Sequence, residues 1–343
     1  MKRIFALAMA LAAFNFASAQ VDLGVLLEGG AEDANTLLEN YMEPAFIGLG
    51  QGLNSGWYNT GKPHKLLGFD LTINANLSYV PSSAEFFTWN DADYTNVRVS
   101  DPTNNQFPTV LGPNLGREDL PEMTFIDSED VDMDGSTTDD LIRITALPGV
   151  GLDDEVGFNA VPTPMVQLGL GLWKNTELKV RLLPTINTGD PGEEFSIGMF
   201  GLGLMHDVKQ WIPGMKLLPF DLSAFVGFNR LNSTFQVDAD NPDQEAELTV
   251  SGFTFQGVIS KEIALLTVYA GVGFLTSNTD FALNGSFDTE SAVLTDPINF
   301  EYSSGSAKFN VGARMKLLIL TLHAEYAFQK YNTLTVGLGF SVR

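Results

Sequence analysis

The acidic run around residue 130 is the stretch whose residue types most resemble a metal-binding site. Aspartates alternate along Asp130-Val131-Asp132-Met133-Asp134-Gly135, and D-x-D-x-D-G is the first half of a calcium loop, with glycine at the sharp turn. Leu141 stands where such a loop needs a bidentate glutamate, and no helical pattern flanks the run. Asp130, Asp132 and Asp134 are therefore a candidate calcium site, with a solvated acidic loop as the alternative.

Motifs for catalysis are absent from the sequence. The three histidines, His64, His206 and His323, lack metal-ligand spacing, and neither H-E-x-x-H nor G-x-S-x-G occurs. The formal charge is −23, which repels nucleic acid and attracts cations to the surface. We expect no enzymatic activity, no nucleic-acid partner and no cofactor apart from the calcium candidate; an outer-membrane hydrolase with serine and histidine at a rim is an alternative.

The stretch Leu67–Tyr79 predicts a long β-strand with one apolar and one polar face, the type of element on which the fold is built. Its odd positions are apolar and its even positions from Asp70 to Ser78 are polar, so the two sets lie on opposite faces of one β-strand. Such a strand is long for a soluble sheet, where about 5–6 residues are usual, and suits a tilted strand that crosses a bilayer. Its apolar face meets either a second sheet or lipid.

The N-terminus has the three parts of a secretory signal peptide. Lys2 and Arg3 are positively charged, Ile4–Phe16 is mainly apolar, and Ala17-Ser18-Ala19 fits a cleavage site. We predict a signal peptide over residues 1–19 and export of the protein. Because the chain contains no cysteine, an exported product has no disulfides and depends on its sheet and its packing.

Alternation of this kind returns after residue 161 and continues to the end of the chain. We expect β-bulges near Met199–Phe200 and Gly252, where the apolar set changes parity. Short turns and long acidic loops alternate between the segments, the longest loop covering about residues 81–161, as in bacterial barrels with short periplasmic turns and long external loops. The ten segments are 67–79, 166–172, 178–182, 195–205, 220–228, 248–259, 266–274, 309–315, 318–328 and 334–342.

These segments predict an all-β fold, an antiparallel transmembrane β-barrel of 10–14 strands over residues 66–343, located in the bacterial outer membrane. Charged side chains are costly against lipid and acceptable in a polar lumen, where opposite charges pair. The charges form either a structural salt-bridge network or a selectivity filter built from Lys179, Arg181 and Arg314. The lumen-lining candidates are Asp70, Glu177, Lys179, Arg181, Asp221, Lys308, Arg314, His323 and Glu325.

Residues 20–65 lack the alternation and predict an N-terminal plug or cap. Asp33 is a candidate N-cap for a short helix over Asp33–Met42, which Pro44 should end or kink. Repeated glycines between Gly48 and Gly61 then favour a flexible segment. We expect this N-terminal segment on the periplasmic side of the barrel. The plug candidates are Leu37, Leu38, Tyr41, Met42, Trp57 and Tyr58.

Three stretches resemble a known family. The run Glu32–Gly61, followed by the strand at Leu67, is similar to an uncharacterised family of outer-membrane barrels from Bacteroidota, whose domain of unknown function covers nearly the whole mature chain. V-P-T-P-M-V-Q-L-G-L-G-L at Val161 and K-V-R-L-L-P at Lys179 resemble its second block. The resemblance implies fold and location and assigns no catalytic residues. More distantly, a plug before a barrel resembles the fatty-acid channel class.

Two main hypotheses for function remain beside the hydrolase. The protein is either an outer-membrane channel or binding barrel, gated by Asp33–Gly61, for a small solute with an apolar one as a candidate, or a structural or adhesive surface barrel whose acidic loops bind cations. Both imply contact with the bilayer and with outer-membrane lipids. The substrate and the oligomeric state stay open.

Overall fold

The fold was analysed in a computed structural model of the whole chain. It describes residue 27 and residues 30–125, 143–153, 157–189, 194–237, 241–288 and 293–342. The predicted signal peptide and the calcium candidates Asp130, Asp132 and Asp134 lie outside the described residues. Among the residues that are described, no helix is both long and apolar enough to cross a bilayer.

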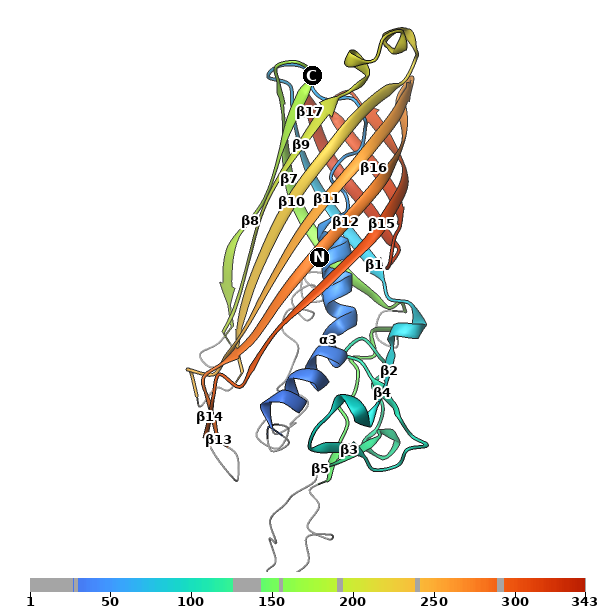
Figure 1. The fold of residues 1–343 in the computed structure, drawn as a ribbon. Coiled ribbons are helices and arrows are strands. Elements are labelled where there is room, and N and C mark those ends of the chain that lie inside the picture. The colour runs from blue at the N-terminus through green and yellow to red at the C-terminus, as the bar shows by residue number, and fades with distance from the viewer. Residues whose placement is uncertain are drawn as a thin grey trace, which may run out of the picture.

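Ten antiparallel strands form one closed barrel, in agreement with the predicted fold class (Figure 1). The first strand pairs with the last along one edge and with the second along the other, and this double pairing closes the sheet. The strands are β1 (Phe69–Tyr79), β7 (Ala160–Leu172), β8 (Thr176–Thr188), β9 (Phe195–Asp207), β10 (Asp221–Gln236), β11 (Glu245–Ile263), β12 (Leu266–Asn284), β15 (Ile298–Leu317), β16 (Leu320–Phe328) and β17 (Thr333–Val342).

The outer face of the barrel is apolar and its inner face is polar. In β1, Leu71 and Ile73 are 46% and 58% exposed, whereas Asn74 between the strand's apolar positions is 1% exposed. Exposed leucine, isoleucine, valine and phenylalanine side chains continue this outer face around the other strands. A closed barrel with this distribution satisfies its backbone hydrogen bonds internally and presents apolar atoms to lipid. The outer face therefore contacts the bilayer.

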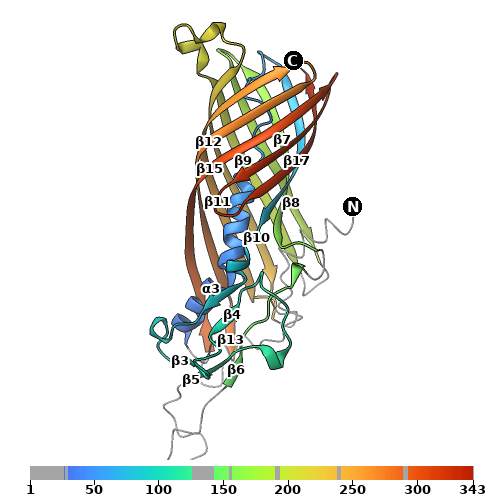
Figure 2. The ribbon, with the colours of Figure 1, turned by 90° about the vertical axis from the view of Figure 1, so that its right-hand side faces the viewer.

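The two ends of the barrel differ in their connections (Figures 1 and 2). At the short-turn end, tight turns join β7 to β8, β11 to β12 and β15 to β16, and β9 joins β10 through two short 3₁₀ helices, η4 (Lys209–Trp211) and η5 (Met215–Leu217). Both β1 and the C-terminal strand have an end there, because Phe69 pairs with Val342. The opposite end carries the long connections and is called the long-loop end.

The loop after β1 is more ordered than its weak periodicity predicts. It contains two small sheets, one of β2 and β4 and one of β3, β5 and β6, which pack into a single apolar cluster with the first half of the N-terminal helix. Within it the rings of Trp89 and Tyr94 stack with centroids 3.8 Å apart, and burial raises the pKa of Tyr94 to about 12. The loop elements are η1 (Ser82–Ala84), β2 (Phe86–Thr88), η2 (Asp91–Asp93), β3 (Val97–Val99), β4 (Gln106–Pro108), η3 (Arg117–Asp119), β5 (Glu122–Phe125) and β6 (Arg143–Thr145), and a hairpin of β13 (Ser286–Asp288) and β14 (Val293–Thr295) lies at the same end.

The N-terminal helix α3 (Ala31–Leu53) is longer than predicted. It continues through Pro44, so this residue does not end the helix, and the predicted flexible glycine segment is wrong for residues up to 53. A Cβ atom on Gly48 would lie 2.4 Å from Val161, one on Gly50 2.2 Å from Ser277, and one on Gly52 2.1 Å from Thr163. The glycines are there because the helix passes close to opposite walls of the barrel, and tertiary packing outweighs their weak helix propensity.

The direction of α3 also differs from the prediction. Its first turns pack against the loop after β1 at the long-loop end, and the chain then runs through the lumen to the short-turn end, where β1 begins (Figure 1). Only the last part of the segment therefore lies at the short-turn end, the end that the sequence predicts to be periplasmic. The physical reason is closure: β1 must start beside the end of β17, while α3 buries its apolar residues against the long loop.

The β-bulge predicted near Gly252 is absent, since the described strand β11 pairs with both of its neighbours without interruption there. At Met199 the pairing of β9 with β10 is also continuous, and the irregularity falls on the opposite strand, β8. The parity changes instead mark inward apolar side chains: Met199 and Val250 pack with Leu53 at the end of α3. Apolar residues face inward there because the lumen holds protein rather than water. The register shift that does occur lies in β8, between Leu183 and Ile186.

Asp33 does not cap α3 as predicted, because the helix starts two residues earlier and Gly30 occupies the N-cap position. The Asp33 carboxylate instead accepts hydrogen bonds from three successive backbone N–H groups of the long loop: Thr95 and Asn96, both at 2.7 Å, and Val97 at 3.0 Å. Hydrogen bonds to a charged acceptor are stronger than neutral ones. This carboxylate therefore fastens the loop to the helix.

We expect Asp33→Ala to speed proteolysis of the chain around residues 94–98 by tenfold or more. A bond to a charged group contributes roughly 1.5–3 kcal/mol, and about 1.4 kcal/mol is a factor of ten in an opening equilibrium. Limited digestion of the folded barrel with mass spectrometry of the first cuts measures this. Glu32→Ala, one residue earlier on an exposed side chain, is the matched control; equal rates in both variants would contradict the role of Asp33.

Candidate functional site in the barrel lumen

The lumen is occupied by α3 and by the irregular segment that follows it, and residues 31–65 are called the plug. Residues 54–65 belong to no helix or strand, so their backbone carbonyl groups need partners from elsewhere. Polar side chains of the wall supply them. Asn74 donates to Gly56 O at 2.8 Å, Gln167 to Trp57 O at 3.0 Å and Ser223 to Gly61 O at 2.7 Å.

Arg181 of β8 contacts the plug through two hydrogen bonds and one aromatic ring. Its Nη1 and Nη2 donate to Leu53 O and Ser55 O, both at 2.7 Å, and its Nε donates to Gln167 Oε1 at 3.0 Å. The guanidinium also lies 3.6 Å from the centre of the Trp57 ring. The side chain is fully buried, and a cation at this place offsets the free carbonyls and the negative dipole at the C-terminal end of α3.

Lys308 approaches the same helix end from β15. Its Nζ donates to Asn54 O at 3.0 Å and to Ser55 Oγ at 3.2 Å, while Asn229 Nδ2 from β10 donates to Leu53 O at 2.9 Å. The last turn of α3 contains no basic residue of its own. Its C-terminal cap therefore comes from three wall strands, β8, β10 and β15. These two buried cations therefore hold the plug through its backbone carbonyl groups.

The structure places the lumen-lining candidates on the inner face of the barrel. Asp221 is the least buried of them, half-buried at the start of β10 with Ser260 Oγ 3.5 Å from its carboxylate. Arg314 Nη1 donates to Asn59 Oδ1 of the plug, and Glu325 accepts from Asn310 Nδ2 at 2.9 Å. The buried ones, each at most 5% exposed, are Asp70, Glu177, Lys179, Arg181, Lys308, Arg314, His323 and Glu325.

The plug candidates divide into two groups. Leu37, Leu38 and Met42 are buried in the cluster at the long-loop end, and Tyr41, half-buried, donates its hydroxyl to Pro148 O at 2.9 Å. Trp57 and Tyr58 are buried deeper in the lumen beside Phe225. Glycines of the wall make room for them, since a Cβ on Gly227 would lie 2.8 Å from the Trp57 ring. The predicted flexible segment around Trp57 is therefore packed.

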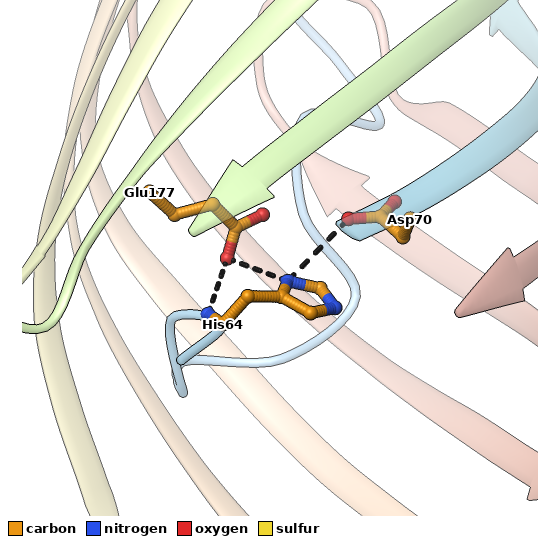
Figure 3. Close-up of side chains that lie close together, drawn as sticks. All are labelled: His64, Asp70 and Glu177. Carbon is orange, nitrogen blue, oxygen red and sulfur yellow. Dashed lines mark hydrogen bonds and ion pairs between the residues drawn. The ribbon is translucent and has the colours of Figure 1, made fainter. Parts of the chain in front are cut away.

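A second cluster of charged side chains lies near the short-turn end (Figure 3). His64 at the end of the plug places its Nδ1 3.0 Å from Glu177 Oε2 and 3.6 Å from Asp70 Oδ1. The other Glu177 oxygen pairs with Lys179 Nζ, and the His64 backbone N–H donates to Glu177 Oε2 at 2.9 Å. Spacing in the sequence missed this cluster because its members come from the plug, β1 and β8. The inward positions of Asp70 and Glu177 were the only sequence signal.

Solved structures similar to this chain are outer-membrane barrels of low sequence identity. The translocator domain of the autotransporter NalP from Neisseria meningitidis is 10% identical, with 91% of this chain and 99% of that chain covered and a TM-score of 0.31. A FadL homologue from Pseudomonas aeruginosa is 10% identical over 80% and 88%, with a TM-score of 0.21, and Ail from Yersinia pestis is 11% identical over 48% and 95%, with a TM-score of 0.25. At these scores the likeness carries no information on function.

Among curated proteins, no sequence matches this chain. A family model described as a family of unknown function, DUF6588, matches residues 1–342. This match agrees with the resemblance to an uncharacterised barrel family, and the closed barrel with its apolar outer face is the architecture of outer-membrane proteins. The chain is an outer-membrane β-barrel protein that belongs to the DUF6588 family of unknown function.

Proposed function

We propose that the protein is a gated passage for small polar solutes across the outer membrane, and that the plug is its gate in the closed position. The observation that carries this proposal is the polar contact between the wall and residues 53–61 of the plug. Wall amides, hydroxyls and cations bind plug carbonyl groups along this stretch. The same groups would line a hydrated path after the plug moved.

A polar contact of this kind suits a gate because water can replace it. A typical intramolecular hydrogen bond contributes only about 0.5–1.5 kcal/mol net, since the separated groups bond to water. Burying an apolar side chain contributes about 1.5–3 kcal/mol, which is lost on exposure. Asn74, Asn76, Gln167 and Asn229 would therefore tolerate hydration better than an apolar wall. For the same reason we propose polar solutes instead of the apolar ones considered from the sequence.

A specific feature favours the alternative of a permanently closed structural or adhesive barrel. The first half of α3 shares an apolar cluster with the loop after β1, including Leu38, Phe46, Trp89 and Phe107. Opening at the long-loop end would expose these side chains, whereas opening deeper in the lumen would hydrate polar contacts at lower cost and expose smaller apolar clusters around Leu53 and Trp57. The proposal therefore places the moving part at residues 49–65, with the first turns of α3 staying docked on the loop.

A disulfide between the plug and the wall tests whether the plug moves. The chain has no cysteine, so Gly52→Cys with Thr163→Cys introduces one pair alone. A Cβ on Gly52 would lie 3.1 Å from Thr163 Cβ, close to the roughly 3.5–4.5 Å of a disulfide. We expect the oxidised variant to block entry of monosaccharides into proteoliposomes and to silence single-channel currents, and reduction of the same sample to restore both.

The reduced double variant is the matched control, since both states carry the same substitutions. Gel mobility with and without heating shows that each preparation is a folded barrel. Equal sugar entry in the oxidised and reduced states would show that the plug is not the gate. Absence of entry in the wild type as well as in the reduced variant would support the permanently closed barrel.

A further inference from the structure

We propose that His64, Asp70 and Glu177 bind a divalent transition-metal ion of the Zn²⁺ class at the short-turn end of the lumen. Each residue offers one ligand atom to a common point, His64 Nδ1, Asp70 Oδ1 and Glu177 Oε2 (Figure 3). Imidazole nitrogen with carboxylate oxygen is a donor set that zinc accepts in proteins. This inference does not depend on the proposed passage.

The distances between the ligand atoms fit a small metal ion. Zinc lies about 2.0–2.2 Å from nitrogen and oxygen ligands in a tetrahedral site, which separates two ligand atoms by roughly 3.3–3.6 Å. His64 Nδ1 lies 3.0 Å from Glu177 Oε2, just below that range, and 3.6 Å from Asp70 Oδ1, at its upper end, and the three residues have ligand atoms within 4.8 Å of one another. Small side-chain rotations would bring them into range, and the fourth position is left for water.

Two of these atoms are buried acceptors without a hydrogen bond. Within the part of the chain that the structure describes, His64 Nδ1 and Asp70 Oδ1 have no hydrogen-bond donor, and both residues are at most 5% exposed. Buried polar atoms are satisfied in the great majority of cases, so these atoms call for a shared partner, which is either a metal ion or a proton on Nδ1.

His64 can act as a metal ligand because its second ring nitrogen also has a partner. Its Nε2 lies 3.2 Å from Ser341 Oγ, which can accept the ring N–H that a ligating histidine usually donates. With the proton on Nε2, the lone pair of Nδ1 points at both carboxylates. The backbone N–H of His64 also donates to Glu177 Oε2 at 2.9 Å. His64 therefore orients the Glu177 carboxylate as well as supplying a ligand atom of its own.

Glycines of β7 create the space for this cluster. A Cβ on Gly169 would lie 2.2 Å from Asp70 Oδ1 and 2.7 Å from Glu177 Oε1, and one on Gly171 would lie 2.0 Å from Lys65 O. The carboxylates and the end of the plug therefore converge over a strip of backbone without side chains. A metal ion there would join the plug, β1 and β8, so its binding energy would stabilise the docked plug.

Lys179 is the feature that opposes metal binding. Its ammonium group pairs with Glu177 Oε1 and is a positive charge next to the site. It leaves Oε2 available, so it lowers affinity without blocking a ligand. We therefore expect Lys179→Met to raise the affinity for Co²⁺ and Zn²⁺ by tenfold or more, a result that an ion pair between His64 and the carboxylates would not give.

The test uses the full-length folded barrel in detergent, freed of metal with a chelator and titrated with Co²⁺. We expect the strong visible absorption bands of four-coordinate cobalt at one equivalent, their displacement by Zn²⁺, and their loss in His64→Ala and Asp70→Asn. His206→Ala and the triple change of Asp130, Asp132 and Asp134 to Asn are controls that should keep the bands, because these residues lie elsewhere in the chain or on the acidic loop.

Two results would overturn the proposal. The first is absence of the cobalt bands in both the wild type and Lys179→Met, which would identify the cluster as an ion pair only. The second is persistence of the bands in His64→Ala or Asp70→Asn, which would place the metal elsewhere. Heat-dependent gel mobility confirms folding of each variant, and Asp70→Asn provides the decisive comparison if His64→Ala does not fold.

Discussion

Replacing Arg181 with alanine is expected to release the C-terminal end of α3 from the barrel wall. The change removes the donors to Leu53 O and Ser55 O and the cation over Trp57. Ser55 O then loses its donor, at a cost of about 1–3 kcal/mol, and Leu53 O keeps its bond from Asn229 Nδ2 but loses one from a charged donor, which contributes about 1.5–3 kcal/mol, so docking of the plug weakens by roughly 2–6 kcal/mol. The plug should then open at least 30-fold more often, since about 1.4 kcal/mol is a factor of ten.

Labelling of a buried cysteine measures this opening. Ser55→Cys places a thiol at a fully buried position in a chain that otherwise has none. We expect a maleimide to react at least 30-fold faster in Arg181→Ala than in the parent. Arg181→Lys should be intermediate, because an ammonium lacks the planar fork that reaches both carbonyls. Arg117→Ala, at an exposed arginine of the long loop, is the control; equal rates for Arg181→Ala and this variant would contradict the role of Arg181.

Adding a methyl group at Gly50 is expected to destabilise the folded protein, although alanine is a better helix former than glycine by about 1 kcal/mol. A Cβ at residue 50 would lie 2.2 Å from Ser277 Oγ and 2.5 Å from Ser277 Cβ, so the helix and β12 must move apart. Overpacking of this kind typically costs 1–3 kcal/mol. The midpoint of denaturant unfolding should therefore fall in Gly50→Ala.

A double variant that adds a Cβ atom at residue 50 and removes the one at residue 277 provides the control for this prediction. Ser277→Gly removes the Cβ that the new side chain would meet, so Gly50→Ala with Ser277→Gly should recover most of the lost midpoint. A helix in open space would gain stability from Gly50→Ala, without any dependence on residue 277. An unchanged or higher midpoint in Gly50→Ala would mean that α3 is not held against β12.

The barrel could be predicted from the sequence because its pattern is local. Each strand of a transmembrane barrel alternates between lipid and interior, so residues such as Leu71 and Asn74 report their face through their position alone. The alternation of short turns and long loops along the chain likewise assigns each connection to one of the two ends of the barrel. The changes of parity near Met199 and Gly252 predicted β-bulges. In the structure they instead mark inward apolar side chains, Met199 and Val250, that pack on Leu53. Alternation shows which face a residue occupies and does not show that the interior holds a helix.

The plug depends on contacts between distant parts of the chain, which no local pattern reports. By propensity, Pro44 and the glycines at 48, 50 and 52 disfavour a helix, yet α3 continues to Leu53 because only glycine fits between Val161, Thr163 and Ser277. Likewise, the local sequence predicts Asp33 as a helix cap, whereas its carboxylate accepts three hydrogen bonds from the distant loop after β1. The strands and their faces thus follow from short-range alternation. The direction of α3, its wall-supplied cap and the meeting of His64 with Asp70 and Glu177 follow from closure of the barrel around the plug.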